Sequence, residues 1–258
     1  MAISTRIGRQ SRLHVVIRSV SPLQPLAWLS RGWSDLRQPG HTSLAYGALL
    51  AATGWVLVLL GSTHPYFIAA AVSGFLLVGP LMTTGVCELS RRLETRESRS
   101  FDDSLEGYTR NHAALLEFGL ILAAISIAWL VTSELLLRSF LQSRPPDLND
   151  VLYGSFLHSA SGAALVPYLL IGGLLAAIAF TLSAVSIPLI LDQHASATEA
   201  MRASIRVVFS NLPAMFVWGA LLVGLVALGF ATLLVGMIWI APLLGHATWH
   251  AYRDLIEH

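Results

Sequence analysis

Residues 212–244 read LPAMFVWGALLVGLVALGFATLLVGMIWIAPLL, which is 33 consecutive positions without a charged side chain. A single helix of this length would extend about 50 Å at 1.5 Å per residue, whereas the hydrocarbon core of a bilayer is about 30 Å thick. One long tilted helix is the alternative, but we expect two short spans that turn near Gly229-Phe230. The stretch therefore predicts a helical hairpin within a membrane.

The rest of the chain has the same apolar character. Of its 258 residues, 55% are hydrophobic and only 12% are charged, about half the charged fraction of an ordinary soluble domain. We expect an all-α, polytopic transmembrane bundle of about six spans, because apolar runs of about 20 residues match the bilayer. The four other predicted spans are residues 44–60, 66–89, 113–137 and 163–191.

Internal similarity indicates that the bundle is built from repeated hairpins. A Pro-Leu pair begins at Pro80, Pro188 and Pro242, each time about ten residues before the polar end of an apolar stretch. A second match, at a constant offset of one hundred residues, joins two polar segments and the spans that follow them. The matched positions are Ser104, Asn111, Ala114, Gly119 and Leu122 with Ser204, Asn211, Ala214, Gly219 and Leu222.

The charges predict the topology. All sixteen basic residues are arginines, and with six spans only Arg138 and Arg144 fall on the side opposite the N-terminus. Because cytoplasmic loops carry the excess of basic residues, we expect both termini in the cytoplasm. Residues 1–40 would be an uncleaved cytoplasmic segment and residues 41–258 a single transmembrane domain. The net charge of +1 gives no support for nucleic-acid binding.

The two polar segments that precede spans each end in an asparagine. Asn111 and Asn211 are predicted to be helix N-caps, with ligand binding as a second interpretation. In the second segment Arg202 and Arg206 share one face and small apolar residues another, which is typical of a helix that lies along the lipid headgroups.

Two histidines form the best candidate for a metal site. His246 and His250 are four residues apart, the spacing that lets two imidazoles on one helical face share a metal ion. We favour the alternative that they are interfacial side chains with an apolar body and a polar tip, and we expect no metal and no cofactor. The neighbours expected at the same membrane level are His112, His194, Asp192, Glu88 and the single cysteine, Cys87, which we interpret as a packing residue.

Glu117 is the candidate for a functional carboxylate inside the membrane. It lies about a turn and a half into the third predicted span, where a buried acid is suited to proton relay or substrate contact. The alternative is a pair with Arg110, or with an arginine of the neighbouring segment, near the surface. No phosphate-binding loop, nucleophile elbow or zinc-protease helix is present, so we expect no enzyme activity.

Four motifs carry a resemblance to a known family. They are GHATWHAYRD at residues 245–254, RGWSDL at residues 31–36, His64-Pro65-Tyr66 and Gly79-Pro80-Leu81. Over about residues 25–256 the chain resembles a bacterial family of integral membrane proteins of unknown function, some of which have been labelled as cytochrome c oxidase subunits. The resemblance implies a multi-span protein of the bacterial inner membrane and supplies no catalytic residues.

Two functions are compatible with this pattern. The first is a non-catalytic accessory or assembly component of a larger membrane complex, such as a respiratory complex, in contact with the lipid bilayer and with other membrane subunits. The alternative is a transporter or permease that uses Glu117 in a polar pathway, since transporters often combine repeats with interrupted helices.

Overall fold

The computed structural model describes residues 15–38, 40–61, 67–140 and 162–257. These residues form an all-α bundle, as the composition predicted. The helices are α1 (Gln24–Arg37), α2 (Gly40–Gly61), α3 (Phe67–Thr95), α4 (Phe101–Arg110), α5 (His112–Phe140), α8 (Gly162–Ser183), α9 (Ser186–Asp192), α10 (Ala197–Ser210), α11 (Leu212–Ala231) and α12 (Met237–Leu255).

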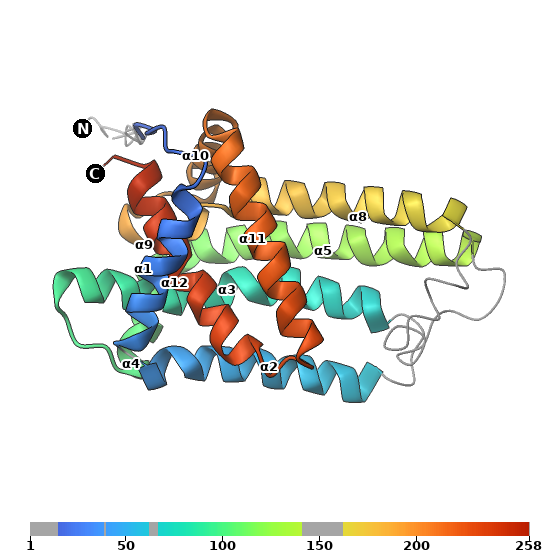
Figure 1. Cartoon of the computed structure of the whole chain (residues 1–258), viewed down its shortest axis with the longest axis horizontal. Coiled ribbons are helices and arrows are strands. Elements are labelled where there is room, and N and C mark those ends of the chain that lie inside the picture. Colours follow the sequence, from blue (N-terminus) through green and yellow to red (C-terminus); the bar gives the residue numbers. More distant parts are fainter. Residues whose placement is uncertain (1–14, 39, 62–66, 141–161, 258) are drawn as a thin grey trace, which may run out of the picture.

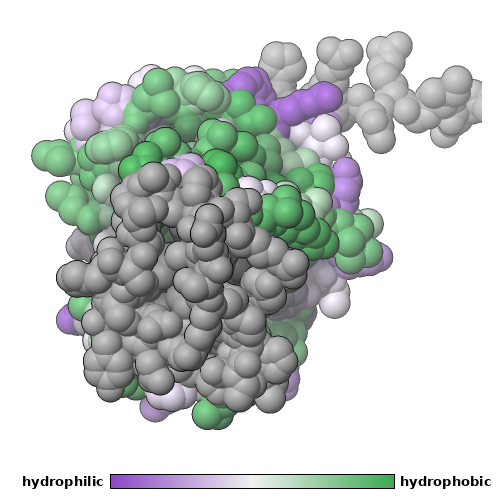
Figure 2. Space-filling model, turned by 90° about the vertical axis from the view of Figure 1, so that its right-hand side faces the viewer, coloured by the Kyte–Doolittle hydropathy of each residue, from purple (hydrophilic) through white to green (hydrophobic). Residues whose placement is uncertain are grey.

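The long helices share one direction, and the polar elements gather at one end of them. Helices α2, α3, α5 and α8 run along the long axis of the molecule, whereas α11 and α12 cross them obliquely (Figure 1). Within the described residues, three helices are long and apolar enough to cross a membrane: His112–Leu136, Val166–Asp192 and Leu212–Ala231. Hydrophobic residues cover much of the visible upper flank of the bundle (Figure 2).

The apolar stretch at residues 212–244 does form a hairpin, which confirms its division into two helices. The connecting turn follows Ala231, and Leu233 and Leu234 adopt positive φ angles of 51° and 67°. Such angles are unfavourable for a leucine, so the surrounding hydrogen bonds must hold the turn. The Leu234 amide donates to the Gly229 carbonyl at 2.9 Å, and the Gly236 amide donates to Thr232 Oγ1 at 2.9 Å. The turn therefore satisfies its own polar groups, as an irregular segment within lipid requires.

The turn of the hairpin lies beside the middle of α2. Ala51, about halfway along α2, packs against Leu234, Met237 and Ile240 in one buried cluster. A Cβ atom on Gly47 would lie 2.1 Å from the Ile238 carbonyl oxygen, so only glycine allows this close approach. The number of complete membrane crossings, expected to be six, stays a prediction.

The fourth predicted span is interrupted. We expected one helix over residues 163–191, but α8 ends at Ser183 and α9 begins at Ser186. Pro188 is the physical reason, since its ring would clash with the carbonyl of Ala184 in a continuous helix and it has no amide proton to donate. The break turns α9 into the polar end of the molecule, where most of its residues are buried.

A buried carboxylate joins α3 and α4 at the polar end. Glu88 is fully buried, and its oxygens accept from Arg91 at 2.9 Å, from Arg92 at 2.9 Å and from Arg110 at 3.1 Å. Arg92 also donates to Glu106 at 2.6 Å. Three guanidinium groups thus offset the cost of removing this charge from water.

Candidate functional site

The motif at residues 245–254 forms the C-terminal half of α12 and lies in the middle of the polar end. Two glycines let neighbouring helices approach it. A Cβ on Gly245 would lie 2.7 Å from Val86 of α3, and a Cβ on Gly32 of α1 would lie 2.8 Å from the Ala247 amide nitrogen. The polar side chains of the motif are therefore enclosed by α1, α2 and α3.

His246 is hydrogen bonded through both ring nitrogens. Its Nδ1 atom lies 2.7 Å from Ser90 Oγ of α3, and its Nε2 atom lies 2.9 Å from Ser43 Oγ of α2. The Ser90 hydroxyl also lies 2.9 Å from Asp35 Oδ2 of α1, and His250 Nε2 meets the same carboxylate oxygen at 2.9 Å. The result is a continuous chain of hydrogen bonds from Ser43 to His250 that connects four helices.

The electrostatics keep His246 neutral. It follows Leu244, the last residue of the apolar stretch, and is completely buried. Burial lowers the pKa of His246 to about 4, and His250 adds to this effect while Asp35 opposes it. A neutral imidazole has one donor and one acceptor nitrogen, which suits two serine hydroxyls that can each donate or accept.

Asp254, at the other end of the motif, holds α1. Its carboxylate accepts from Gln24 Nε2 at 2.8 Å and from Trp28 Nε1 at 2.8 Å, and it forms an ion pair with Arg31. Burial alone would raise the pKa of Asp254, but these three donors together lower it. All three donors come from α1, so a single carboxylate fixes the position of that helix.

The remaining polar residues of the motif also meet partners within the chain. Trp249 Nε1 donates to Glu94 at 3.0 Å, and Tyr252 donates to Asp192 of α9 at 2.6 Å. Arg253 pairs with Glu94 at 3.3 Å. The motif thus joins α1, α2, α3 and α9 to one helix.

This arrangement is suited to holding helices together and not to nucleophilic catalysis. Ser43 and His246 are within hydrogen-bond distance, like a nucleophile and its base. Both residues are completely buried, however, so no substrate atom can approach the serine oxygen.

Both histidines lie close to Asp35: His250 Nε2 is 2.9 Å and His246 Nδ1 is 4.0 Å from its Oδ2 atom. His246 meets the two serines and His250 meets Asp35, as the contacts above describe. In the described part of the chain, no group of three or more His, Cys, Asp or Glu residues could hold a metal ion. Cys87 is buried, and its Sγ lies 3.6 Å from the Gly245 carbonyl oxygen, a packing position.

Glu117 lies on the outside of α5. It is exposed, and it accepts a hydrogen bond of 3.3 Å from Thr198 Oγ1 of α10. It therefore contacts the amphipathic segment near the polar end, although its partner is Thr198 and not Arg110.

The two asparagines hold distant chain segments. Asn211 Nδ2 donates to the Arg18 carbonyl at 3.1 Å, and its Oδ1 accepts from the Val20 amide at 2.9 Å. The expectation that Asn211 caps α11 is wrong, because its side chain makes no capping hydrogen bond. Asn111 Nδ2 donates to the Ala195 carbonyl at 2.8 Å, which anchors the segment between α9 and α10.

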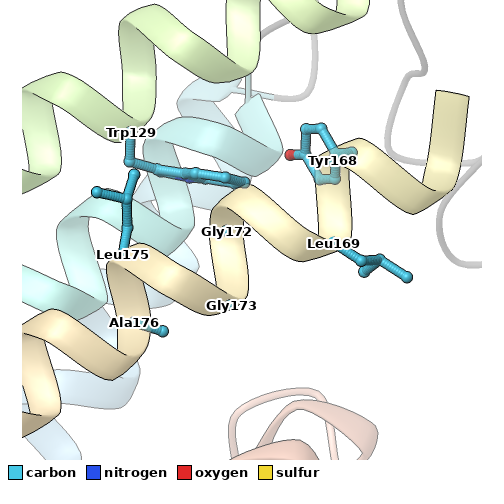
Figure 3. A pocket seen from close by; sticks show the side chains of 7 residues that line it. All are labelled: Trp129, Tyr168, Leu169, Gly172, Gly173, Leu175 and Ala176. Carbon is cyan, nitrogen blue, oxygen red and sulfur yellow. The ribbon is translucent and has the colours of Figure 1, made fainter.

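A separate apolar pocket of about 230 Å³ lies between α5 and α8. Figure 3 shows Trp129 of α5 beside Gly172, with Tyr168 next to them on α8. Tyr168 Oη lies 3.0 Å from Ser133 Oγ, and the Trp129 indole nitrogen has no hydrogen-bond partner among the residues that the structure describes. The lining includes no charged residue and does not include Glu117.

The residues that bind the motif at residues 245–254 were not identified from the sequence. Asp35 and Asp254 stand in two of the four motifs that carry the family resemblance, and their joint presence was a usable signal. Ser43 and Ser90 gave no signal, because a serine near the end of an apolar helix is ordinary.

Comparison with known proteins agrees with this architecture. Residues 67–192 match the family described as predicted integral membrane protein (DUF2189), which confirms the resemblance to a membrane-protein family of unknown function. No curated protein and no solved structure matches the chain significantly.

Proposed function

We propose that this protein is a non-catalytic accessory or assembly component of a larger membrane complex. The observation that carries the proposal is an uncovered small-residue face on α11. Ala220 and Gly224, one turn apart, are both exposed, and a Cβ added to Gly224 would meet no atom within 4 Å. Small residues at this spacing let a second helix pack closely in lipid, where apolar burial alone gives little drive for association.

The polar end supports the same proposal. The polar side chains of the motif at residues 245–254 bind α1, α2, α3 and α9, and its serine–histidine pair is closed to substrates. The surface that suits a second membrane helix is therefore the apolar flank. Glu117 lies at the outer surface beside Thr198, a position that gives a polar transport pathway no support.

The test is affinity purification from native membranes in mild detergent, with identification of the proteins that co-purify and measurement of haem absorbance. Gly224→Leu should abolish co-purification of the partner while leaving the chain folded, because the new side chain enters open space and leucine favours a helix. Ala124→Leu, on the exposed face of α5, adds a comparable side chain elsewhere and should retain the partner. Haem in the purified complex would identify it as respiratory.

Two results would contradict the proposal. Unchanged co-purification with Gly224→Leu would exclude the α11 face as the contact surface. A wild-type protein that leaves native membranes with no stoichiometric partner would exclude the accessory role itself.

A further inference from the structure

The outward face of α10 carries two arginines without an acidic partner. Arg202 and Arg206 are one turn apart and exposed, and neither forms an ion pair with another residue that the structure describes. The opposite face, with Ala200, Ala203 and Val207, is buried against the bundle. The positive charge therefore points away from the protein.

The matching helix α4 shows that this charge is particular to α10. At the offset of one hundred residues, the positions of Arg202 and Arg206 correspond to Asp102 and Glu106. Glu106 is neutralised by Arg92 within the chain. Each helix begins with a capping box and ends at an asparagine, but the two carry opposite charge at these matched positions.

The arginines lie where a membrane surface is expected. Asn211 alone separates α10 from α11, a helix with the length and hydropathy of a membrane span. Phe209, three residues after Arg206, is 65% exposed, and Phe216, in the second turn of α11, is 80% exposed. Phe209 therefore extends the face of the two arginines with an uncovered aromatic ring, and Phe216 exposes a second ring at the start of the next helix.

We infer that this face binds the headgroup of an anionic phospholipid. The planar guanidinium groups of Arg202 and Arg206 match the phosphodiester oxygens of a lipid headgroup, and arginine can bind two of them at once. Phe209 and Phe216 contact the acyl chains below the headgroup, as aromatic residues do at a membrane interface. Glu117 binds Thr198, one turn before Arg202, and adds negative charge at the N-terminal end of the face. The headgroup therefore sits nearer to Arg206 than to Thr198.

The experiment measures binding of fluorescent phosphatidylglycerol to the full-length protein in non-ionic detergent micelles. Each arginine near an anionic lipid surface strengthens binding about fivefold, so Arg202→Gln with Arg206→Gln should weaken it about 25-fold. Phosphatidylcholine, which has no net charge, should bind equally weakly to both proteins. The double variant should fold normally, because neither side chain contributes an internal ion pair.

The control variant removes the same charge elsewhere at the polar end. Arg96 and Arg99, in the loop between α3 and α4, are exposed and form no ion pair with a described residue. Arg96→Gln with Arg99→Gln should leave the affinity for phosphatidylglycerol within about twofold.

Three results would overturn the inference. Equal weakening in the two double variants would mean that net charge and not this face attracts the lipid. Unchanged binding in the Arg202 and Arg206 variant would mean that these arginines face solvent and do not bind the lipid. Displacement of the lipid by equimolar glycerol phosphate would assign the arginines to a free anion.

Discussion

Asp254 binds three side chains of α1, whereas an exposed ion pair joins only two residues. Its carboxylate satisfies the indole N–H of Trp28, which is completely buried, together with Gln24 and Arg31. Removal of the acceptor leaves a buried donor without a partner, and the cost of that loss usually exceeds the net gain from forming the bond.

We expect Asp254→Ala to lower the free energy of unfolding by about 2 kcal/mol, because it leaves both Trp28 and Arg31 without their acceptor. Glu257→Ala is the matched control. The Arg18–Glu257 pair is 3.5 Å long with both side chains 52% exposed, so its loss should cost less than about 0.5 kcal/mol. Denaturant titration in detergent, followed by tryptophan fluorescence, measures both values. Equal effects would mean that Asp254 does not anchor α1.

His246 makes stability depend on pH. Its pKa in the folded protein is lowered to about 4 from an ordinary value of 6.5, so the unfolded chain takes up the proton first. The neutral histidine contributes fully above pH 6.5, and this contribution disappears as the pH falls from 6.5 through 4. The loss over that window is on the order of 2–3 kcal/mol.

Measurement of unfolding free energy between pH 7 and pH 4 tests this dependence. His246→Asn keeps a donor and an acceptor but does not titrate, so its stability should change less over the window than that of the wild type. His112→Asn, at an exposed position, should keep the wild-type slope. If His246→Asn has the wild-type slope as well, another group is responsible for it.

At the scale of the elements, the α11–α12 hairpin is shorter than the bundle of long helices against which it packs. Its turn packs on Ala51, about halfway along α2, and therefore lies within the hydrocarbon if α2 spans the membrane. We expect Val235→Cys, at a position exposed from the protein, to resist membrane-impermeant thiol reagents from both sides of sealed vesicles. Ser210→Cys, at the exposed end of α10, should react from one side. Reaction of Val235→Cys from the opposite side would show that the hairpin crosses completely.

The elements could be predicted from the sequence to the extent that they depend on local properties. Hydrophobic length divided residues 212–244 into two helices, and the structure places the turn a few residues after the expected Gly229-Phe230. The break at residues 184–185 was not predicted, because a proline near the end of an apolar stretch can also lie inside a continuous helix, as Pro242 does in α12.

The partners of the candidate site could not be predicted in the same way. Asn211 was expected to cap its own helix, but its side chain binds Arg18 and Val20 from the beginning of the chain. The serines that meet His246 belong to two other helices. These pairings depend on how helices that are distant in the sequence pack together. The sequence of one helix does not show which residues of another helix it will contact.

The whole molecule is closed by a contact between its two ends. Ile17 and Ile256 form an antiparallel bridge, and the Arg18 amide donates to the Leu255 carbonyl at 2.9 Å. The described ends of the chain therefore lie together at the polar end (Figure 1). This arrangement supports an even number of crossings, as in the prediction that both termini are cytoplasmic.

Ile17→Cys combined with Ile256→Cys should form a disulfide on mild oxidation, because directly opposed residues in an antiparallel pair are close enough for one. The cross-linked chain should migrate faster than the reduced chain in a denaturing gel. Either cysteine alone should give no shift, since Cys87 is buried. No cross-link in the double variant would mean that the termini do not pair in the membrane.

The contact of α1 with α12 also sets an order of events during synthesis. The ribosome makes α1 before α12, and the acceptor Asp254 is translated 226 residues after its donor Trp28. While the helices between them enter the bilayer, α1 has no helix to pack against. Its tryptophans must therefore remain at the membrane surface or bound to a chaperone. The motif at residues 245–254 completes the polar end, so a nascent chain that stops before this motif exposes α1 to quality-control proteases.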